Sequence, residues 1–451
     1  MKKAHAIKLW LAIIIFAAIG QVAWVVENEF FSVFVYEILH EETTVNAIEV
    51  IAWMIGASAI TGTLTTLLIG ALSDKIGKRK TLISVGYIVW GLSIMSFALI
   101  NVENCGRLFG TVSAASTTAL IVIIADCLMT FFGASANEAG FNAWITDIST
   151  KENGGIIEGV LAIAPVLALI FVFTSSFFVD GGSFLRWQLV YIALGFGTLV
   201  AGVLGFFLLE DSKKLAKNTD GYWRNLISGF RIKTIKKHAK LYLILITFFL
   251  FCLATEISLP YLFIYLHYDS SLLISNHMIV FISGIALLVA SVVSILYGHA
   301  LDRFGTKHLL APAILVFFVG LFILALPLFN GASANLTMII IGVVLMFSGN
   351  FMVATHIGML YRDETPKTSV GVFQGIRVLA TVLLPMTIGP WVGARIIQNT
   401  FTFVELGETT PVPTPWVFLT SALVLLLMII PVFFLHKLEK KEEDRHEPVK
   451  E

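Results

Sequence analysis

The sequence is poor in charged residues. Only 13% of its 451 residues are Asp, Glu, Lys or Arg, whereas soluble domains carry about 25%. Acidic and basic residues balance to a net charge of zero, which argues against a nucleic-acid partner. Hydrophobic residues make up 57% of the chain, and so much apolar surface needs a lipid bilayer to face. The composition therefore predicts a membrane protein rather than two or three soluble domains.

Cysteine and the motifs of common enzymes are also scarce. Cys105, Cys127 and Cys252 are odd in number and two lie in apolar runs, so we expect free thiols rather than a disulfide framework. The chain has no Gly-x-x-x-x-Gly-Lys-Ser/Thr loop, no His-Glu-x-x-His and no Cys-x-x-Cys. No nucleophile and base stand at a convincing spacing. We expect neither an enzyme nor an ATP-driven pump, and no cofactor or bound metal.

Long apolar runs are abundant. A spanning helix needs roughly 20 mainly apolar residues. Spans are predicted at 9–39, 47–69, 81–100, 117–147, 155–179, 187–209, 241–268, 276–297, 309–329, 336–360, 370–398 and 415–436. The expected fold class is an all-α membrane protein with about twelve transmembrane helices. The first and fourth spans are long enough that they should tilt, break or project beyond the lipid.

The placement of Lys and Arg predicts the orientation. With the N-terminus inside, all but four of the 30 basic residues fall in cytoplasmic segments. Arg107 and Arg186 then lie outside, and Arg377 and Arg395 lie within a span. We therefore expect a multi-pass protein of the cell membrane with both termini in the cytoplasm.

Four segments make up the predicted domain organisation. Residues 1–209 form an N-terminal six-helix half and residues 241–436 a C-terminal one. The basic linker 210–240 is either an amphipathic helix at the membrane surface or a solvated segment. Residues 437–451 form a charged cytoplasmic tail, for which the composition predicts disorder.

Two pairs of loops repeat each other. Residues 70–80 read Gly-Ala-Leu-Ser-Asp-Lys-Ile-Gly-Lys-Arg-Lys, and residues 298–308 read Gly-His-Ala-Leu-Asp-Arg-Phe-Gly-Thr-Lys-His. Both place Gly, Asp, a base and Gly at the same spacing. A second set is repeated 216 residues further on; it comprises Asp147, Lys151, Gly155 and Gly159, mirrored by Asp363, Lys367, Gly371 and Gly375. Two similar six-helix halves are predicted, as in transporters built from repeats.

These loops resemble a known family. Segment 70–80 looks like the signature loop between the second and third helices of the major facilitator superfamily, and segment 298–308 looks like its degenerate copy. The span layout and the long central loop agree, so the resemblance covers the whole chain. It implies alternating access, with the loop residues locking the cytoplasmic side. The gating residues would then be Gly70, Asp74, Gly77, Lys78, Arg79, Asp147, Gly298, Asp302, Arg303 and Gly305.

Physical reasoning suggests how such a lock could act. Asp74 could cap a helix of the other half near Gly371, and Lys78 or Arg79 could pair with Asp147. Contacts that break on opening would bias a two-state equilibrium. The alternative is that these bases only enforce the cytoplasmic orientation.

Polar residues on the predicted first helix suggest a binding face. Gln21, Trp24 and Asn28 share one side, with Glu27 beside them. A ring next to amide and carboxylate groups suits a polar ligand with an apolar face, such as a sugar.

The predicted fourth helix carries a polar and small stripe. Its members are Asp126, Thr130, Gly133, Asn137, Gly140, Trp144 and Asp147. Asp126 falls near mid-depth, and an ionisable residue in the membrane marks a functional path by default. It is a candidate site for a proton or a sodium ion; the alternative is a structural bond to a neighbouring helix.

The second half adds further candidates. Glu256 lies one turn before Pro260, which should weaken the helix there, and Tyr261 follows. Gln374 and Arg377 share a face of the eleventh helix. Because Arg377 is a permanent cation, it needs an anion, which could be Asp126, Glu27 or an anionic substrate group.

The embedded acids outnumber the embedded bases, which suggests coupling to a cation. Acids on helices one and four, a base on helix eleven and segment 137–159 also resemble the glycoside–pentoside–hexuronide:cation symporter group. The sequence departs from that group on the second helix, where Glu49 near the outer end is the only acid before the repeat loop.

The predicted function is secondary active transport of a small polar solute, a sugar or a glycoside, coupled to H⁺ or Na⁺. The alternative is a proton-coupled exporter of amphipathic or cationic compounds. Expected partners are a small-molecule substrate and the lipid bilayer, with no nucleic acid, and we expect a functional monomer.

Overall fold

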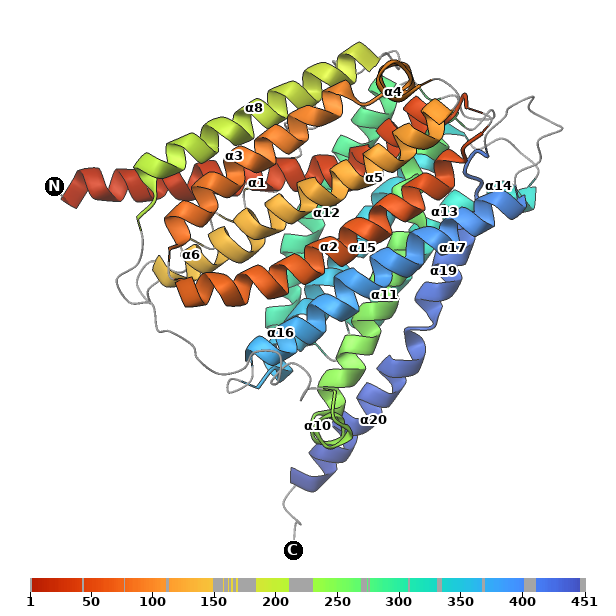
Figure 1. Ribbon diagram of the computed structural model, residues 1–451. Helices are drawn as coiled ribbons and strands as arrows, with labels where there is room; N and C mark the ends of the chain where they lie inside the picture. The colour runs from red at the N-terminus through yellow and green to blue at the C-terminus, as the bar shows by residue number, and fades with distance from the viewer. Residues whose placement is uncertain are drawn as a thin grey trace, which may run out of the picture. The chain divides into compact units, whose positions relative to one another are not determined.

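The computed structural model is helical in all its regular elements, with no strand among the described residues (Figure 1). It describes residues 2–42, 44–76, 78–110, 113–148, 157, 161, 164, 168, 184–210, 230–268, 274, 276–306, 309–330, 335–366, 370–400 and 411–446. The chain divides into two compact units. The first comprises Met1–Asp220, Ser275–Val280 and Phe403–Pro411; the second comprises Gly221–Ile274, Phe281–Thr402 and Val412–Glu451.

The helices of the first unit match the predicted spans. They are α1 (Lys2–Leu39), α2 (Ala47–Ile76), α3 (Arg79–Ser96) with the 3-10 turn η1 (Phe97–Leu99), α4 (Val102–Phe109), α5 (Ala114–Gly133), the π-helical η3 (Ala134–Phe141), α6 (Asn142–Ile148) and α8 (Phe184–Leu208). Together α5, η3 and α6 form the long fourth span, which is helical throughout and contains a π-helical stretch; whether it tilts or projects beyond the lipid stays a prediction. The fifth span, 155–179, falls almost entirely outside the described residues.

The second unit contains the remaining spans. Its elements are α10 (Ile232–Lys237), α11 (Ala239–Tyr268), α12 (Asn276–Phe304, in this unit from Phe281), α13 (Leu310–Ala325), α14 (Pro327–Asn330), α15 (Leu336–Glu364), α16 (Val370–Val378), the π-helical η4 (Leu379–Leu383), α17 (Leu384–Thr400), α19 (Trp416–Leu426) and α20 (Ile429–His446). Within the described part of the chain, ten helices are long and apolar enough to cross a membrane, and α13 is a shorter apolar helix.

Close backbone approach holds α3 and α8 together, and Figure 1 shows the two helices running side by side. A Cβ added to Gly91 would lie 2.5 Å from the carbonyl oxygen of Gly195, and the same distance separates a Cβ on Gly195 from the oxygen of Gly91. Only glycine fits at this crossing. Small residues at helix crossings are typical of membrane proteins, where association depends on van der Waals packing.

One local expectation is corrected by the structure. The tail is not irregular throughout, since α20 continues to His446. Its Lys and Glu residues are good helix formers and stand at spacings that allow i,i+4 pairs.

Pro260 lies inside α11, which is one helix from Ala239 to Tyr268. Neighbouring helices can stabilise a membrane helix that contains proline. The local weakening expected near Glu256 stays a prediction.

The predicted linker helix lies mostly outside the described residues. Residues 210 and 230–240 are described there; α10 covers Ile232–Lys237, and its side chains are exposed or half-buried. The interfacial position of this linker therefore stays a prediction.

Candidate functional site

Three helices of the first unit meet at the carboxylate of Glu27. Glu27 on α1 accepts a hydrogen bond from the Thr130 hydroxyl of α5 at 2.8 Å and another from the Ser58 hydroxyl of α2 at 3.2 Å. Both bonds end on the same oxygen, Oε1. The two hydroxyls lie 2.6 Å apart. The three side chains therefore form one connected polar group among three mainly apolar helices.

Asp126 completes this group from one turn before Thr130. Its side chain is only 2% exposed, and its charge interacts with that of Glu27. Within the described part of the chain, no hydrogen-bond partner reaches Oδ1 of Asp126 or Oε2 of Glu27, although both atoms are buried. Two neighbouring carboxylates removed from water cannot both be ionised without a large cost. The site therefore needs a proton or a bound cation.

The other candidates on α1 differ in their surroundings. Trp24 packs against Trp90 of α3, with ring centroids 5.7 Å apart, and its indole nitrogen is buried without a described partner. Asn28 is exposed and donates to the carbonyl oxygen of Trp24 on its own helix. Gln21 is half-buried. Trp24 thus supplies the aromatic ring of the predicted binding face, and its indole N–H has no described partner.

Asn137 lies in the π-helical stretch η3, where its side chain contacts α1 and α3. Its side chain is 5% exposed, accepts a hydrogen bond from the Tyr87 hydroxyl at 3.2 Å and packs over Gly20 of α1. This contact holds α1, α3 and η3 together. The predicted binding role of Asn137 stays a prediction.

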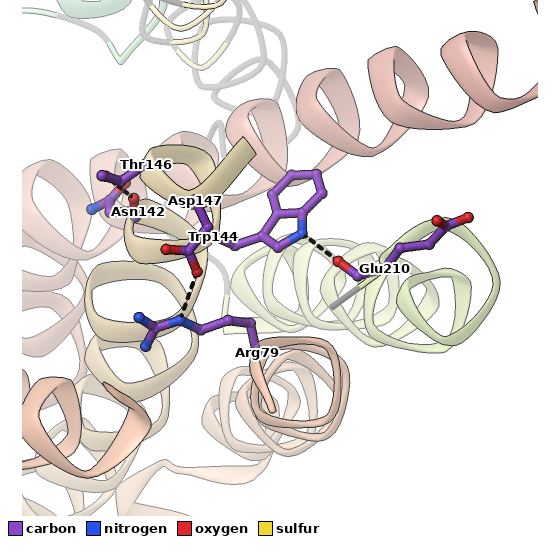
Figure 2. Close-up of polar contacts among 6 residues, drawn as sticks. All are labelled: Arg79, Asn142, Trp144, Thr146, Asp147 and Glu210. Carbon is purple, nitrogen blue, oxygen red and sulfur yellow. Dashed lines mark hydrogen bonds and ion pairs between the residues drawn. The ribbon is translucent and has the colours of Figure 1, made fainter. Parts of the chain in front are cut away.

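An ion pair and an indole hydrogen bond organise one end of the first unit. Arg79, the first residue of α3, pairs through Nε with Asp147 of α6 at 3.2 Å, as Figure 2 shows. The predicted pairing of Arg79 with Asp147 is confirmed. In the same view the Trp144 indole donates to the carbonyl oxygen of Glu210 at 2.9 Å, which joins α6 to the segment after α8.

The remaining residues of the first repeat loop cannot be placed in this arrangement. The surroundings of Gly70 and of the Asp74 side chain lie outside the described part of the structure, as does Gly77 altogether. Lys78 is exposed. The predicted cap by Asp74 therefore stays a prediction.

In the second unit, residues of the second repeat loop, 298–308, and of the end of α15 border a cavity of about 580 Å³. It lies between the C-terminal ends of α12 and α15, and its walls include Gly298, Asp302, Arg362 and Asp363. The two repeated sequence sets thus converge in space in this unit. Arg303 lies over the ring of Phe304 at 5.3 Å and does not border the cavity.

Gly305 ends α12 with a left-handed backbone. Its φ is +78°, and its N–H bonds to the carbonyl oxygen of Leu301 at 2.9 Å. This is the helix C-terminal geometry that glycine adopts at no steric cost. This left-handed backbone explains why the second glycine of the repeat loop 298–308 is a glycine.

Arg377 is the embedded base of the second unit. Its guanidinium lies 5.5 Å from the ring centroid of Tyr361, and its Nε is buried with no described hydrogen-bond partner. Glu256 on α11 lies in the same region, since both charges act on the thiol of Cys252.

The last two binding candidates have different environments. Tyr261 is fully buried and donates to the carbonyl oxygen of Pro390 at 2.6 Å, so its hydroxyl joins α11 to α17. Gln374 is exposed. Their predicted contact with substrate stays a prediction.

The sequence analysis missed two residues of these sites. Ser58 is a serine in the apolar part of α2, and Tyr361 is a common aromatic near a helix end; neither stands in a recognisable motif. Only the packing of α1, α2 and α5 brings Ser58 to Glu27. Among the described residues, no group of three His, Cys, Asp or Glu side chains could hold a metal ion.

The chain matches the model of one protein family over most of its length. The family model of the Major Facilitator Superfamily matches residues 9–376 and 259–451. Comparison with curated protein sequences gives no significant match. The narrower resemblance to the glycoside–pentoside–hexuronide:cation symporter group is not established by these matches and stays a prediction.

Solved structures share the fold at low sequence identity. A mutant of the nucleoside transporter NupG has a TM-score of 0.69 at 14% identity, with 95% of this chain and 99% of that chain covered. A D-xylose-proton symporter has a TM-score of 0.68 at 14% identity, with 93% and 97% covered. A bacterial homologue of the iron transporter ferroportin, in its inward-facing state, has a TM-score of 0.65 at 12% identity, with 96% and 99% covered.

Helical architecture, sequence repeats and the family match over most of the chain agree. The chain is a multi-span membrane protein that belongs to the Major Facilitator Superfamily.

Proposed function

We propose that this transporter moves a small polar solute, a sugar or a glycoside, by alternating access and couples its movement to H⁺ or Na⁺. The observation that carries the proposal is the buried acid pair Glu27 and Asp126, with the hydroxyls of Ser58 and Thr130 beside it. An acid pair that must take up a cation is the element that coupling requires.

The pair has the chemistry of a coupling site. Oxygen ligands suit a hard cation, and two like-charged carboxyl groups can also share one proton. Cation uptake neutralises the site and its release restores the repulsion. If the two states of the transporter differ in how well they hold the cation, its gradient drives the cycle.

The similar solved structures support the solute class without assigning it. Two of them are described as a nucleoside transporter and a D-xylose-proton symporter. Trp24 beside Glu27 suits a ligand with an apolar ring face and polar edges. We assign solute contact to this face of the first unit, to Glu256 and to Arg377.

Gating is assigned to the repeat loops. The Arg79–Asp147 pair lies within one unit, so rigid-body rocking of the halves leaves it intact, and it serves to hold the cytoplasmic ends of α3 and α6 together. Asp302 and Asp363, at the cavity in the second unit, are the residues we assign to contacts that form and break.

The proposal includes an orientation and an organisation of the chain. Both termini lie in the cytoplasm of a cell-membrane protein, and the two halves, 1–209 and 241–436, act as one functional monomer. The basic segment 210–240 connects them.

Uptake by proteoliposomes tests the proposal. Purified protein is reconstituted, and accumulation of radiolabelled D-xylose, D-glucose and methyl glycosides is measured under an imposed proton gradient, an imposed sodium gradient or neither. D-glucuronate is included as an acidic member of the same class. Accumulation of at least one of these solutes under one gradient is expected, and Glu27→Gln should abolish it. Glu103→Gln is the matched control because Glu103 is an exposed acid of the same unit. Equal uptake with and without both gradients would refute cation coupling.

A further inference from the structure

Arg377 is a cation without an anion among the described residues. Its Nε is buried and makes no hydrogen bond, and no described carboxylate forms an ion pair with it. Its guanidinium carbon lies over the ring of Tyr361, 5.5 Å from the ring centroid. A guanidinium cannot lose its charge as a buried carboxylate can. The buried Nε–H of Arg377 therefore still needs a hydrogen-bond acceptor.

Tyr361 brings a second polar group to the same place. The residue is 3% exposed, and its hydroxyl lies beside the Thr365 side chain and the charge of Arg377. A phenol can donate to an oxyanion that a guanidinium attracts. A guanidinium and a phenol hydroxyl thus lie together on α15 and α16.

The backbone around Arg377 is locally specialised. The hydroxyl of Thr381 donates to the carbonyl oxygen of Arg377 at 2.9 Å, and the π-helical η4 begins two residues after Arg377. Pro385, just beyond η4, has no N–H to offer to the preceding turn. Single π-helical turns are frequent at functional sites. Here the turn alters the register of the helix directly after the arginine.

Two other cations of the second unit have polar protein partners. Arg395 on α17 also lies over an aromatic ring, Trp391 at 5.9 Å, but it donates to Gln398 at 3.2 Å and is exposed. At the start of α11, Lys240 pairs with Glu364 at 2.5 Å. These cations of the same unit have protein partners, whereas Arg377 has an aromatic face only.

We propose that Arg377 and Tyr361 form a subsite for an oxyanion, a carboxylate or a phosphate, carried by the transported solute. This inference rests on the proposed function, because it assigns a charge to the solute of that transporter. Arg377 binds the oxyanion through its guanidinium, and the Tyr361 hydroxyl donates a further hydrogen bond. The solute class is therefore an acidic sugar derivative rather than a neutral sugar.

Cys252 provides a reporter that needs no knowledge of the substrate. Its thiol is half-buried and experiences the charge of Arg377. With Cys105 and Cys127 replaced by Ala, Cys252 is modified by two reagents of similar size and opposite charge, the sulfonatoethyl and the trimethylammonioethyl methanethiosulfonates. The ratio of the anionic to the cationic modification rate is measured by mass spectrometry.

The expected result is a ratio that falls about fivefold or more in Arg377→Gln, as the loss of one nearby charge implies. Arg377→Lys should retain most of it, which separates loss of charge from misfolding. Arg395→Gln is the matched control and should leave it unchanged. An unchanged ratio in Arg377→Gln overturns the inference, and so does failure of both reagents to reach Cys252.

Uptake of a matched solute pair then separates this inference from the proposed function. D-glucuronate and D-glucose share a ring and differ by a carboxylate. Preferential uptake of D-glucuronate, lost in Arg377→Gln, supports the subsite. Gradient-driven accumulation of D-glucose that Arg377→Gln leaves intact overturns the subsite while the proposed function stands. A charge-selective Cys252 ratio without gradient-driven uptake of either sugar contradicts the proposed function and leaves the subsite standing.

Discussion

Arg79 and Asp147 form an ion pair across 68 residues of sequence, with Nε and Oδ2 3.2 Å apart. The arginine side chain is 3% exposed and the aspartate 21%. The guanidinium is therefore largely removed from water and pairs there with this carboxylate. The pair joins the first turn of α3 to the last turns of the fourth span.

Asp147→Ala should destabilise the protein. It removes the carboxylate that pairs with a buried guanidinium, and breaking a fully buried pair costs several kcal/mol; because Asp147 is partly exposed, we expect about 2–3 kcal/mol. The measurement is the midpoint of thermal unfolding of the purified protein. Replacing both residues with apolar ones should recover most of the loss.

Arg107→Ala is the control for this prediction. Arg107 pairs with Glu103 on α4, but both side chains are more than two-thirds exposed, and such pairs contribute little. No resolvable change in the unfolding midpoint is expected. An equal loss in the two variants would mean that burial of the Arg79 pair has no energetic consequence.

Two glycines of α8 should respond oppositely to substitution by alanine. Gly195→Ala places a Cβ 2.5 Å from the carbonyl oxygen of Gly91, so α3 and α8 must separate, and overpacking of this kind costs about 1–3 kcal/mol. At Gly197 no atom lies within 4 Å of an added Cβ. Gly197→Ala should be neutral or stabilise the helix by up to about 1 kcal/mol. Thermal unfolding of both variants checks the contrast.

The sequence predicts the spans well because hydrocarbon imposes a simple rule on composition. Apolar runs and the repeated loops locate the helices. The first repeat loop offers Lys78 and Arg79 as partners of Asp147, and the structure shows the pair with Arg79. The same periodicity cannot distinguish a π-helical stretch from α-helix, so η3 and η4 were not predicted. Nor does it single out Ser58, whose position at Glu27 depends on how three helices pack.

Burial explains why some predicted binding residues have other contacts. Tyr261 and Asn137 were singled out because they are polar residues in apolar segments. In the structure each forms a hydrogen bond with a neighbouring helix: Tyr261 donates to Pro390, and Asn137 accepts from Tyr87. A buried polar group needs such a partner whether or not it binds a solute, so polarity in a span alone does not identify a binding residue.

The proposed orientation predicts a labelling pattern. In a background without native cysteines, Leu108→Cys on α4 should react with a membrane-impermeant maleimide in intact cells, and Ile232→Cys on α10 only after permeabilisation. Both positions are more than two-thirds exposed, so access depends on the side of the membrane. The opposite pattern would reverse the orientation.

The two hydroxyls at Glu27 should matter for coupling rather than for folding alone. Thr130→Val removes the 2.8 Å bond to Glu27 and keeps the side-chain shape. Because Ser58 donates to the same oxygen, Thr130→Val and Ser58→Ala should be non-additive. We expect each to lower gradient-driven uptake several-fold, and the double variant to lower it by less than the product.

Thr118→Val supplies the control for hydroxyl loss. Thr118 lies on the same helix as Thr130 but donates to the carbonyl oxygen of Ala114 one turn back. Uptake should be unchanged in this variant. Equal losses in Thr118→Val and Thr130→Val would indicate general damage to α5 and not a role at the acid pair.

The acid pair is tested most directly by separating accumulation from exchange in Asp126→Asn. The variant keeps the side-chain shape and removes one of two interacting charges. In proteoliposomes we expect it to lose accumulation against a concentration gradient under the coupling-ion gradient, while it still exchanges labelled for unlabelled solute downhill. Accumulation at the parental level in Asp126→Asn would contradict the assignment of cation coupling to Asp126 and Glu27.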